Sequence, residues 1–147
     1  MADHLKADIY FSEDFSFEAL TADEAKISDV EKQMCRSWFK ENILTDKTPA
    51  YDFAVDGKHL KEGITDWNIS VGSESEVGAV RAGGKTVLVT LNHKTSDITV
   101  TVEATIFEDY ATCEWTVYIE NTGNDNSPVI EDFYAADCDI ETGKADV

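Results

Sequence analysis

A strict two-residue alternation of apolar and polar side chains is the feature that most limits the possible folds of this chain. From Ile98 to Ile106 every second side chain is apolar, and threonines and one glutamate occupy the positions between them. The pattern returns from Cys113 to Ile119, with Trp115 and Val117 on the apolar side. Because successive side chains of a strand point to opposite faces, this pattern predicts strands that each bury one face.

Short polar turns separate the predicted strands. Alternation begins near Pro49, and turns are expected at 56–58 and 83–84. Two alternating segments, 114–123 and 127–137, flank a loop of Asn, Asp, Gly and Thr, and we expect them to form an antiparallel hairpin with one buried face. No helix-length segment separates the later strands, which argues against parallel crossovers. We therefore predict a mainly β fold, an antiparallel β-sandwich with one N-terminal α-helix.

The helix is expected ahead of the first of these strands. Thr21 and Glu24 have the spacing of a capping box, and Ser28 and Glu31 offer a second possible start. The pattern ends near Asn42, before a turn-like T-D-K-T-P segment. The apolar stripe at helical spacing consists of Ile27, Val30, Met34 and Trp38.

The length of 147 residues indicates a single domain, 1–147. Three phenylalanines in its first part share a period of two and predict a short strand segment within 1–20. The helix is expected over 21–44 and the antiparallel sandwich over 49–147.

Acidic residues dominate the charge of the chain. Thirty acidic against 12 basic residues give a net charge of −18 and a pI near 4.2. Such a surface repels phosphate groups, which argues against nucleic acids and anionic membranes as partners. The three cysteines lack C-x-x-C spacing and the N-terminus lacks a long apolar run, so we expect free thiols in a cytoplasmic bacterial protein.

Several motifs between Pro49 and Asp137 together resemble a known family. They are Y-D-F-A-V-D-G-K, the pair Asp66-Trp67, E-W-T-V-Y-I-E-N-T-G and S-P-V-I-E-D-F-Y-A-A-D. This stretch is similar to the N-terminal β-sandwich of alpha-galactosidase-like glycoside hydrolases, family 36 and relatives. The resemblance implies a supersandwich, similar to the galactose mutarotase fold, placed ahead of a catalytic (β/α)8 barrel.

In that family the barrel carries both catalytic carboxylates, so the resemblance implies no catalytic residue in this chain. It implies a non-catalytic domain that supports the barrel and subunit contacts, as the N-terminal part of a larger hydrolase. The alternative is a stand-alone carbohydrate-binding module. The family's sandwich has further strands, so we also expect an open sheet edge and self-association.

Trp67, with Asp66 beside it, is the residue we predict for carbohydrate contact, because aromatic faces pack on the apolar faces of sugars. Trp38 and Trp115 lie on predicted buried faces and are expected in the core. Close acidic pairs such as Glu131-Asp132 and Asp137 with Asp139 are expected to be solvated, since a chain this acidic produces them by chance.

No metal or cofactor is expected. His4, His59 and His93 lack the spacing of a zinc site, although His93, beside a long strand, leaves open a mutarotase-like cleft. The loop 121–127 is rich in oxygen ligands, but it lacks the order of an EF-hand loop and reads more simply as turn chemistry.

Overall fold

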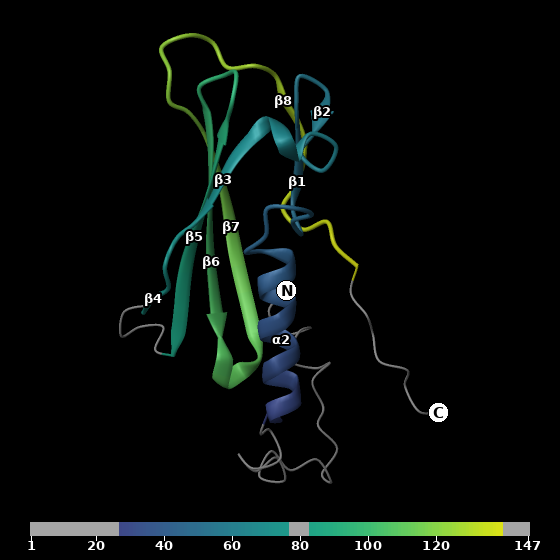
Figure 1. The fold of residues 1–147 in the computed structure, drawn as a ribbon, viewed down its shortest axis with the longest axis vertical. Coiled ribbons are helices and arrows are strands. Elements are labelled where there is room, and N and C mark those ends of the chain that lie inside the picture. Colours follow the sequence, from purple (N-terminus) through teal and green to yellow (C-terminus); the bar gives the residue numbers. More distant parts are fainter. Residues whose placement is uncertain (1–26, 77–82, 140–147) are drawn as a thin grey trace, which may run out of the picture.

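The predicted fold class is confirmed by the computed structural model, which describes residues 27–76 and 83–139. Two antiparallel sheets and one α-helix form the described part of the chain (Figure 1). The predicted strand within 1–20 and the Thr21–Glu24 cap lie outside the described residues.

The larger sheet has five strands and contains the long alternating segments. Its order is β3-β5-β6-β7, and β4 pairs with the far end of β5. The register aligns apolar positions across the strands, with Val89 opposite Val102 and Val102 opposite Val117, so one face of the sheet is continuously apolar. The strands are β3 (Trp67–Val71), β4 (Ser75–Glu76), β5 (Gly84–His93), β6 (Ile98–Phe107) and β7 (Thr112–Asn121).

The smaller sheet has the order β2-β1-β8, formed by β1 (Asp52–Val55), β2 (Lys58–His59) and β8 (Ile130–Tyr134). The predicted turn between β1 and β2 is confirmed. Asp56 and Gly57 have φ angles of 48° and 79°, the two positive values of a tight hairpin turn. Short 3-10 helices precede β3 (Ile64–Asp66) and β7 (Glu108–Tyr110).

The predicted hairpin between 114–123 and 127–137 is wrong. Among the described strands, β8 pairs with β1 rather than with β7, so the chain crosses from one sheet to the other. The reason lies in the loop, where Thr122 donates from its backbone N–H and its hydroxyl to the carbonyl of Asp97, 2.8 and 2.9 Å away. Asp56 then pairs with Val129 through two hydrogen bonds of 2.9 Å. Tertiary pairing therefore overrides the local turn signal.

The helix α2 (Asp29–Asn42) begins at the second predicted cap and ends where the sequence predicts. Ser28 and Glu31 form a reciprocal capping box. Residues 27 and 28 are not helical, so the expected continuous helix over 21–44 is wrong at its start.

The buried side of α2 also differs from the predicted stripe. Val30 and Met34 are 65% and 66% exposed, whereas Phe39 is 3% exposed. Cys35 and Trp38 are partly buried on the same side as Phe39. Trp38 is the member of the predicted stripe on α2 that packs against the core, and only the C-terminal half of α2 buries apolar side chains deeply.

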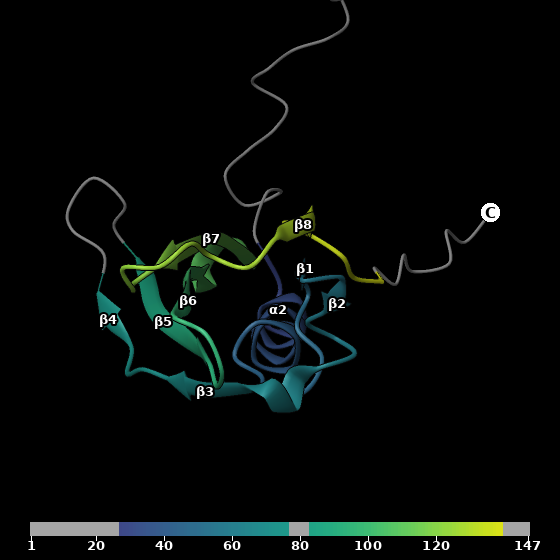
Figure 2. The same cartoon turned by 90° about the horizontal axis from the view of Figure 1, so that it is seen from above.

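The larger sheet curves around α2 and the smaller sheet (Figure 2). Along the sheet, α2 lies beside one half of β7 and the smaller sheet covers the other half (Figure 1). The enclosed core includes Phe53, Leu60 and the inward side chains of β5 and β6. Thr105, predicted on the wetter face, is 2% exposed, and its hydroxyl is hydrogen-bonded to that of Thr86 at 2.7 Å. Within the described ranges, no helix is long and apolar enough to cross a membrane.

Candidate functional site

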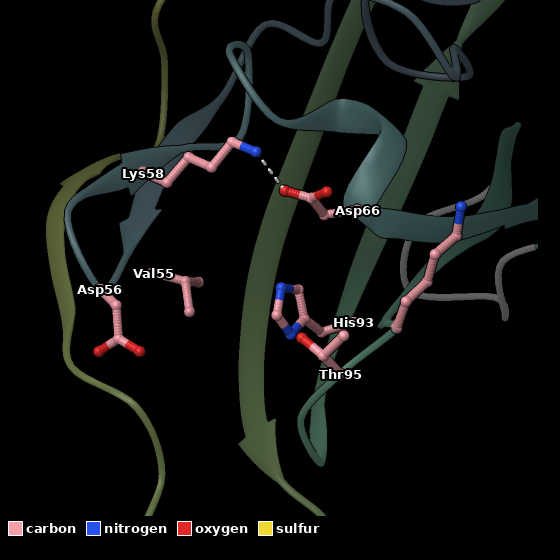
Figure 3. A pocket seen from close by; sticks show the side chains of 7 residues that line it. Val55, Asp56, Lys58, Asp66, His93 and Thr95 are labelled. Carbon is pink, nitrogen blue, oxygen red and sulfur yellow. Dashed lines mark hydrogen bonds and ion pairs between the residues drawn. The ribbon is translucent and has the colours of Figure 1, made fainter.

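A hollow of about 450 Å³ opens where the two sheets meet, at the end marked by the β1–β2 turn. We call it the charged hollow. Three separate parts of the chain build it: the β1–β2 hairpin, the 3-10 helix before β3, and the turn after β5. Its lining residues are Val55, Asp56, Lys58, Asp66, His93, Lys94 and Thr95 (Figure 3).

An ion pair spans one side of the charged hollow. Lys58 Nζ lies 2.7 Å from Asp66 Oδ2, and this hydrogen bond is the main cause that lowers the pKa of the Asp66 carboxyl. Gly63 lies against both side chains, and a Cβ there would come within 2.6 Å of Lys58 and 2.8 Å of Asp66. A side chain at position 63 would therefore push Lys58 and Asp66 away from their present positions.

The remaining polar groups are oriented by their neighbours. The His93 imidazole and the Asp66 carboxylate both face the open space (Figure 3), and His93 Nδ1 lies 2.7 Å from the hydroxyl of Ser96. Lys94 Nζ donates to the carbonyl of Thr65 at 2.6 Å. The hollow therefore offers hydrogen-bond donors and acceptors in fixed positions, and it carries both positive and negative charges.

The two residues predicted for carbohydrate contact are separated by the fold. Asp66 lines the charged hollow, whereas Trp67 is 7% exposed. The Trp67 ring packs edge-on against Phe53, with centroids 5.5 Å apart, and lies 4.8 Å from the His93 ring. Trp67 therefore supports His93 from within the core and has little open ring face for a sugar. Trp38 and Trp115, expected in the core, pack against it as partly buried side chains.

A second polar cluster was missed by sequence reasoning, which treated His59 as isolated. His59 Nδ1 lies 2.7 Å from Asp52 Oδ2, and Nε2 lies 3.4 Å from Asp132 Oδ2. Asp52 is 5% exposed and also accepts a hydrogen bond from the N–H of Lys61. The hydrogen bond to Asp52 is the main cause that raises the pKa of His59. We call this set the His59 clamp, because it joins β2 to β1 and β8.

The geometry of Asp132 explains why the clamp was missed. Regular alternation would place Glu131 and Asp132 on opposite faces with no shared role. The register between β1 and β8 is irregular here, and Asp132 has a φ of 50°. Such an irregularity redirects a side chain, and nothing in the local sequence marks it.

Asp137 and Asn121, from the acidic pairs and the oxygen-rich loop noted in the sequence, make structural contacts. Asp137 pairs with Lys61 at 2.7 Å, and the side chain of Asn121 is used within its own turn, accepting from the N–H of Gly123 and donating to the carbonyl of Asp125. Within 27–76 and 83–139, no group of three or more His, Cys, Asp or Glu side chains could hold a metal ion.

Comparison of the chain with protein-family models, with curated proteins and with solved structures gives no match. The resemblance to alpha-galactosidase-like hydrolases therefore stays a prediction from the motifs.

Proposed function

We propose that this chain is a non-catalytic carbohydrate-binding β-sandwich whose ligand site is the charged hollow. One observation carries the proposal: two aspartates, two lysines, a histidine and a threonine line one opening of about 450 Å³. This size lies within the usual range of small-molecule sites. The charges of Asp56 and Asp66 balance those of Lys58 and Lys94, although the whole chain carries −18.

A lining whose charges balance, and which combines apolar surface with carboxylate, ammonium and imidazole groups, suits an uncharged ligand that is rich in hydroxyl groups. Each sugar hydroxyl both donates and accepts, so it can meet carboxylate, ammonium and imidazole groups at once. A simple anion or cation would meet repulsion from one half of the lining. Neutral monosaccharides, galactose among them, are therefore the ligand class we propose.

The same geometry argues against bond cleavage at this site. Glycosidases need a carboxylic acid that stays protonated near neutral pH, facing a second carboxylate across the bond. The pKa of Asp66 is shifted downward, chiefly by its hydrogen bond with Lys58, so this carboxyl is ionised at neutral pH. It can accept hydrogen bonds from a sugar but cannot protonate a leaving group.

Calorimetric titration with a panel of neutral monosaccharides tests the binding proposal. We expect Asp66→Asn and Lys58→Met each to weaken binding by about tenfold or more, because each removes a charged hydrogen-bonding group. Lys47→Met is the matched control, since Lys47 is exposed and does not line the hollow. Absence of binding to every neutral sugar by the wild-type chain would overturn the proposal.

A second candidate function is the support of a catalytic barrel in a larger alpha-galactosidase-like hydrolase. The exposed apolar side chains around β8 favour it, with Val129, Phe133 and Tyr134 between 47% and 61% exposed. An edge strand with such side chains is suited to contact another domain. Co-expression of this chain with a barrel domain from the same reading frame tests this second function. We expect a stable complex, and we expect Phe133→Lys to disrupt it.

We also propose that the protein works in the cytoplasm. All three cysteines lie in the described segments and all are free thiols. Free thiols are usual in reducing compartments. Fractionation of cells that express the native gene would test the location, and recovery outside the cytoplasm would contradict it.

A further inference from the structure

The three cysteines of this chain come together in the fold, although they are far apart in the sequence. Cys35 lies on α2, Cys113 on β7, and Cys138 in the segment after β8. The side chains of Cys35 and Cys113 lie close enough for each to shift the pKa of the other, and Cys138 lies close enough to Cys113 to raise its pKa. All three pack against the hydrophobic core as partly buried residues. We call them the thiol cluster.

The contacts around the thiol cluster hold Cys35 and Cys113 beside each other. One turn along α2 and two residues along β7, the rings of Trp38 and Trp115 pack with centroids 5.8 Å apart. Arg36, next to Cys35, forms a 2.9 Å ion pair with Glu108 of the 3-10 helix that precedes β7. Contacts close to both cysteines therefore join α2 to β7 and to the 3-10 helix before it, where α2 runs alongside β7 (Figure 1).

The third thiol is brought to this joint by the C-terminal segment. Trp115 Nε1 donates to the carbonyl of Ala135 at 2.7 Å, which ties the residues before Cys138 to β7. Cys138 itself lines a second, smaller hollow together with Lys61 and Asn42. A small solute from solvent can therefore reach the edge of the cluster.

We propose that the thiol cluster is an oxidation site, at which a peroxide converts Cys35 and Cys113 into a disulfide that ties α2 to β7. The domain then has a reduced state and an oxidised state, in which the disulfide joins α2 to β7.

The reaction balances with hydrogen peroxide as the oxidant. The Cys35 thiolate attacks one peroxide oxygen, an S–O bond forms, the O–O bond breaks, and the departing hydroxide takes up a proton as water. The Cys113 sulfur, having lost its proton, then attacks the Cys35 sulfur, so the S–S bond forms and the S–O bond breaks. The second hydroxide also leaves as water. Two thiols and one peroxide give one disulfide and two waters.

The surroundings assign the order of these steps and keep the resting state reduced. Burial raises the pKa of Cys35 and raises that of Cys113 to about 11, so both thiols are mostly protonated at neutral pH. The contact between the two thiols lowers the pKa of Cys35 and raises that of Cys113, which favours Cys35 as the first nucleophile. Since the thiolate is the reactive form, oxidation requires sustained peroxide rather than trace amounts.

Peptide mapping of the intact wild-type chain tests the proposal without any substitution. The folded protein is treated with hydrogen peroxide, remaining thiols are alkylated, and disulfide-linked peptides are identified by mass spectrometry without reduction. We expect a peptide pair that joins Cys35 to Cys113, reversed by a thiol reductant. Independent oxidation of the three cysteines to sulfinic or sulfonic acids, with no linked pair, would overturn the proposal.

Thermal unfolding gives the second readout, with matched variants. A disulfide across this joint should raise the Tm of the oxidised protein by about 5–10 °C over the reduced protein. Cys138→Ser should keep this shift, whereas Cys35→Ser should lose it. A shift that survives Cys35→Ser but disappears in Cys138→Ser would assign the disulfide to the wrong pair and contradict the proposal.

Discussion

His59 shows how a single residue connects strands that are distant in the sequence. Its two ring nitrogens face carboxylates from two different strands, Asp52 on β1 and Asp132 on β8. Glu62, which follows β2, adds a further favourable charge and, with both aspartates, raises the pKa of His59. The protonated ring therefore stabilises the smaller sheet, and this contribution must depend on pH.

The sign of this dependence follows from the raised pKa of His59. Folding stability from the clamp is complete below the unfolded value of 6.5, where the ring is charged in both states. It is lost as the pH rises through the higher folded value. We expect the difference in Tm between wild type and His59→Gln to be largest near pH 5.5–6.5 and to shrink toward pH 9.

Thermal unfolding of both proteins across this range measures the effect. Comparing the two proteins at each pH cancels the general repulsion among the acidic residues of the chain. Asp132→Asn is the informative partner variant, because it removes one of the two facing carboxylates and should reduce the pH-dependent difference without abolishing it. A difference that stays constant from pH 5.5 to 9 would contradict the clamp.

Among the elements, α2 has its start fixed by a local signal and its orientation fixed by tertiary packing. The second capping box, Ser28 with Glu31, was visible in the sequence and is the one that forms. The buried face was not predictable from spacing alone. Cys35 and Phe39 have the same four-residue helical spacing as Val30 and Met34. Packing against the sheet determines which of the two pairs is buried.

Ser28→Ala should lower the free energy of unfolding by about 1 kcal/mol, because it leaves the N–H of Glu31 without its capping oxygen. Ser37→Ala is the matched control: Ser37 lies inside α2 and is exposed, so alanine there should be neutral or slightly stabilising. Urea unfolding followed by circular dichroism measures both. Equal effects of the two substitutions would mean that the cap adds nothing.

For the strands too, some features were predictable from the sequence and others depend on tertiary packing. The one-sided faces of β5, β6 and β7 were predictable, because a period of two fixes which side chains share a face whatever the neighbours are. The partner of β8 was not predictable, since the loop of Asn, Asp and Gly residues before it permits either a hairpin or a crossing. Thr122 donates hydrogen bonds to Asp97, which lies on a turn far away in the sequence. These bonds favour the path in which the chain crosses from the larger sheet to the smaller one.

At the scale of the whole molecule, the candidate sites are products of the topology rather than of local motifs. Asp66 was identified as a site residue from its motif, but Lys58 and His93 join it only because the two sheets meet there. The thiol cluster likewise needs α2, β7 and the segment after β8 in place. The sequence pattern predicts which residues share one face of a strand or helix. It does not predict which of these faces meet in the folded chain.

Two sheet edges favour contacts between copies of the whole molecule. Among the described strands, β8 is an edge of the smaller sheet, β7 is an edge of the larger one, and both carry exposed aromatic side chains. An apolar edge favours association, while a charge of −18 on each copy opposes it at low salt. We therefore expect self-association that increases with protein concentration and with ionic strength, since salt screens the repulsion between copies.

Multi-angle light scattering at low and high salt, with two matched variants, measures this association. Phe133 and Leu88 are 47% and 48% exposed, but Phe133 lies on β8 whereas Leu88 lies on the outer face of β5. Phe133→Lys should keep the protein monomeric under all conditions, and Leu88→Lys should leave association unchanged, because a charge interferes only where it would be buried. A wild-type protein that stays monomeric at high concentration and high salt would show that the β8 edge does not bind a second copy.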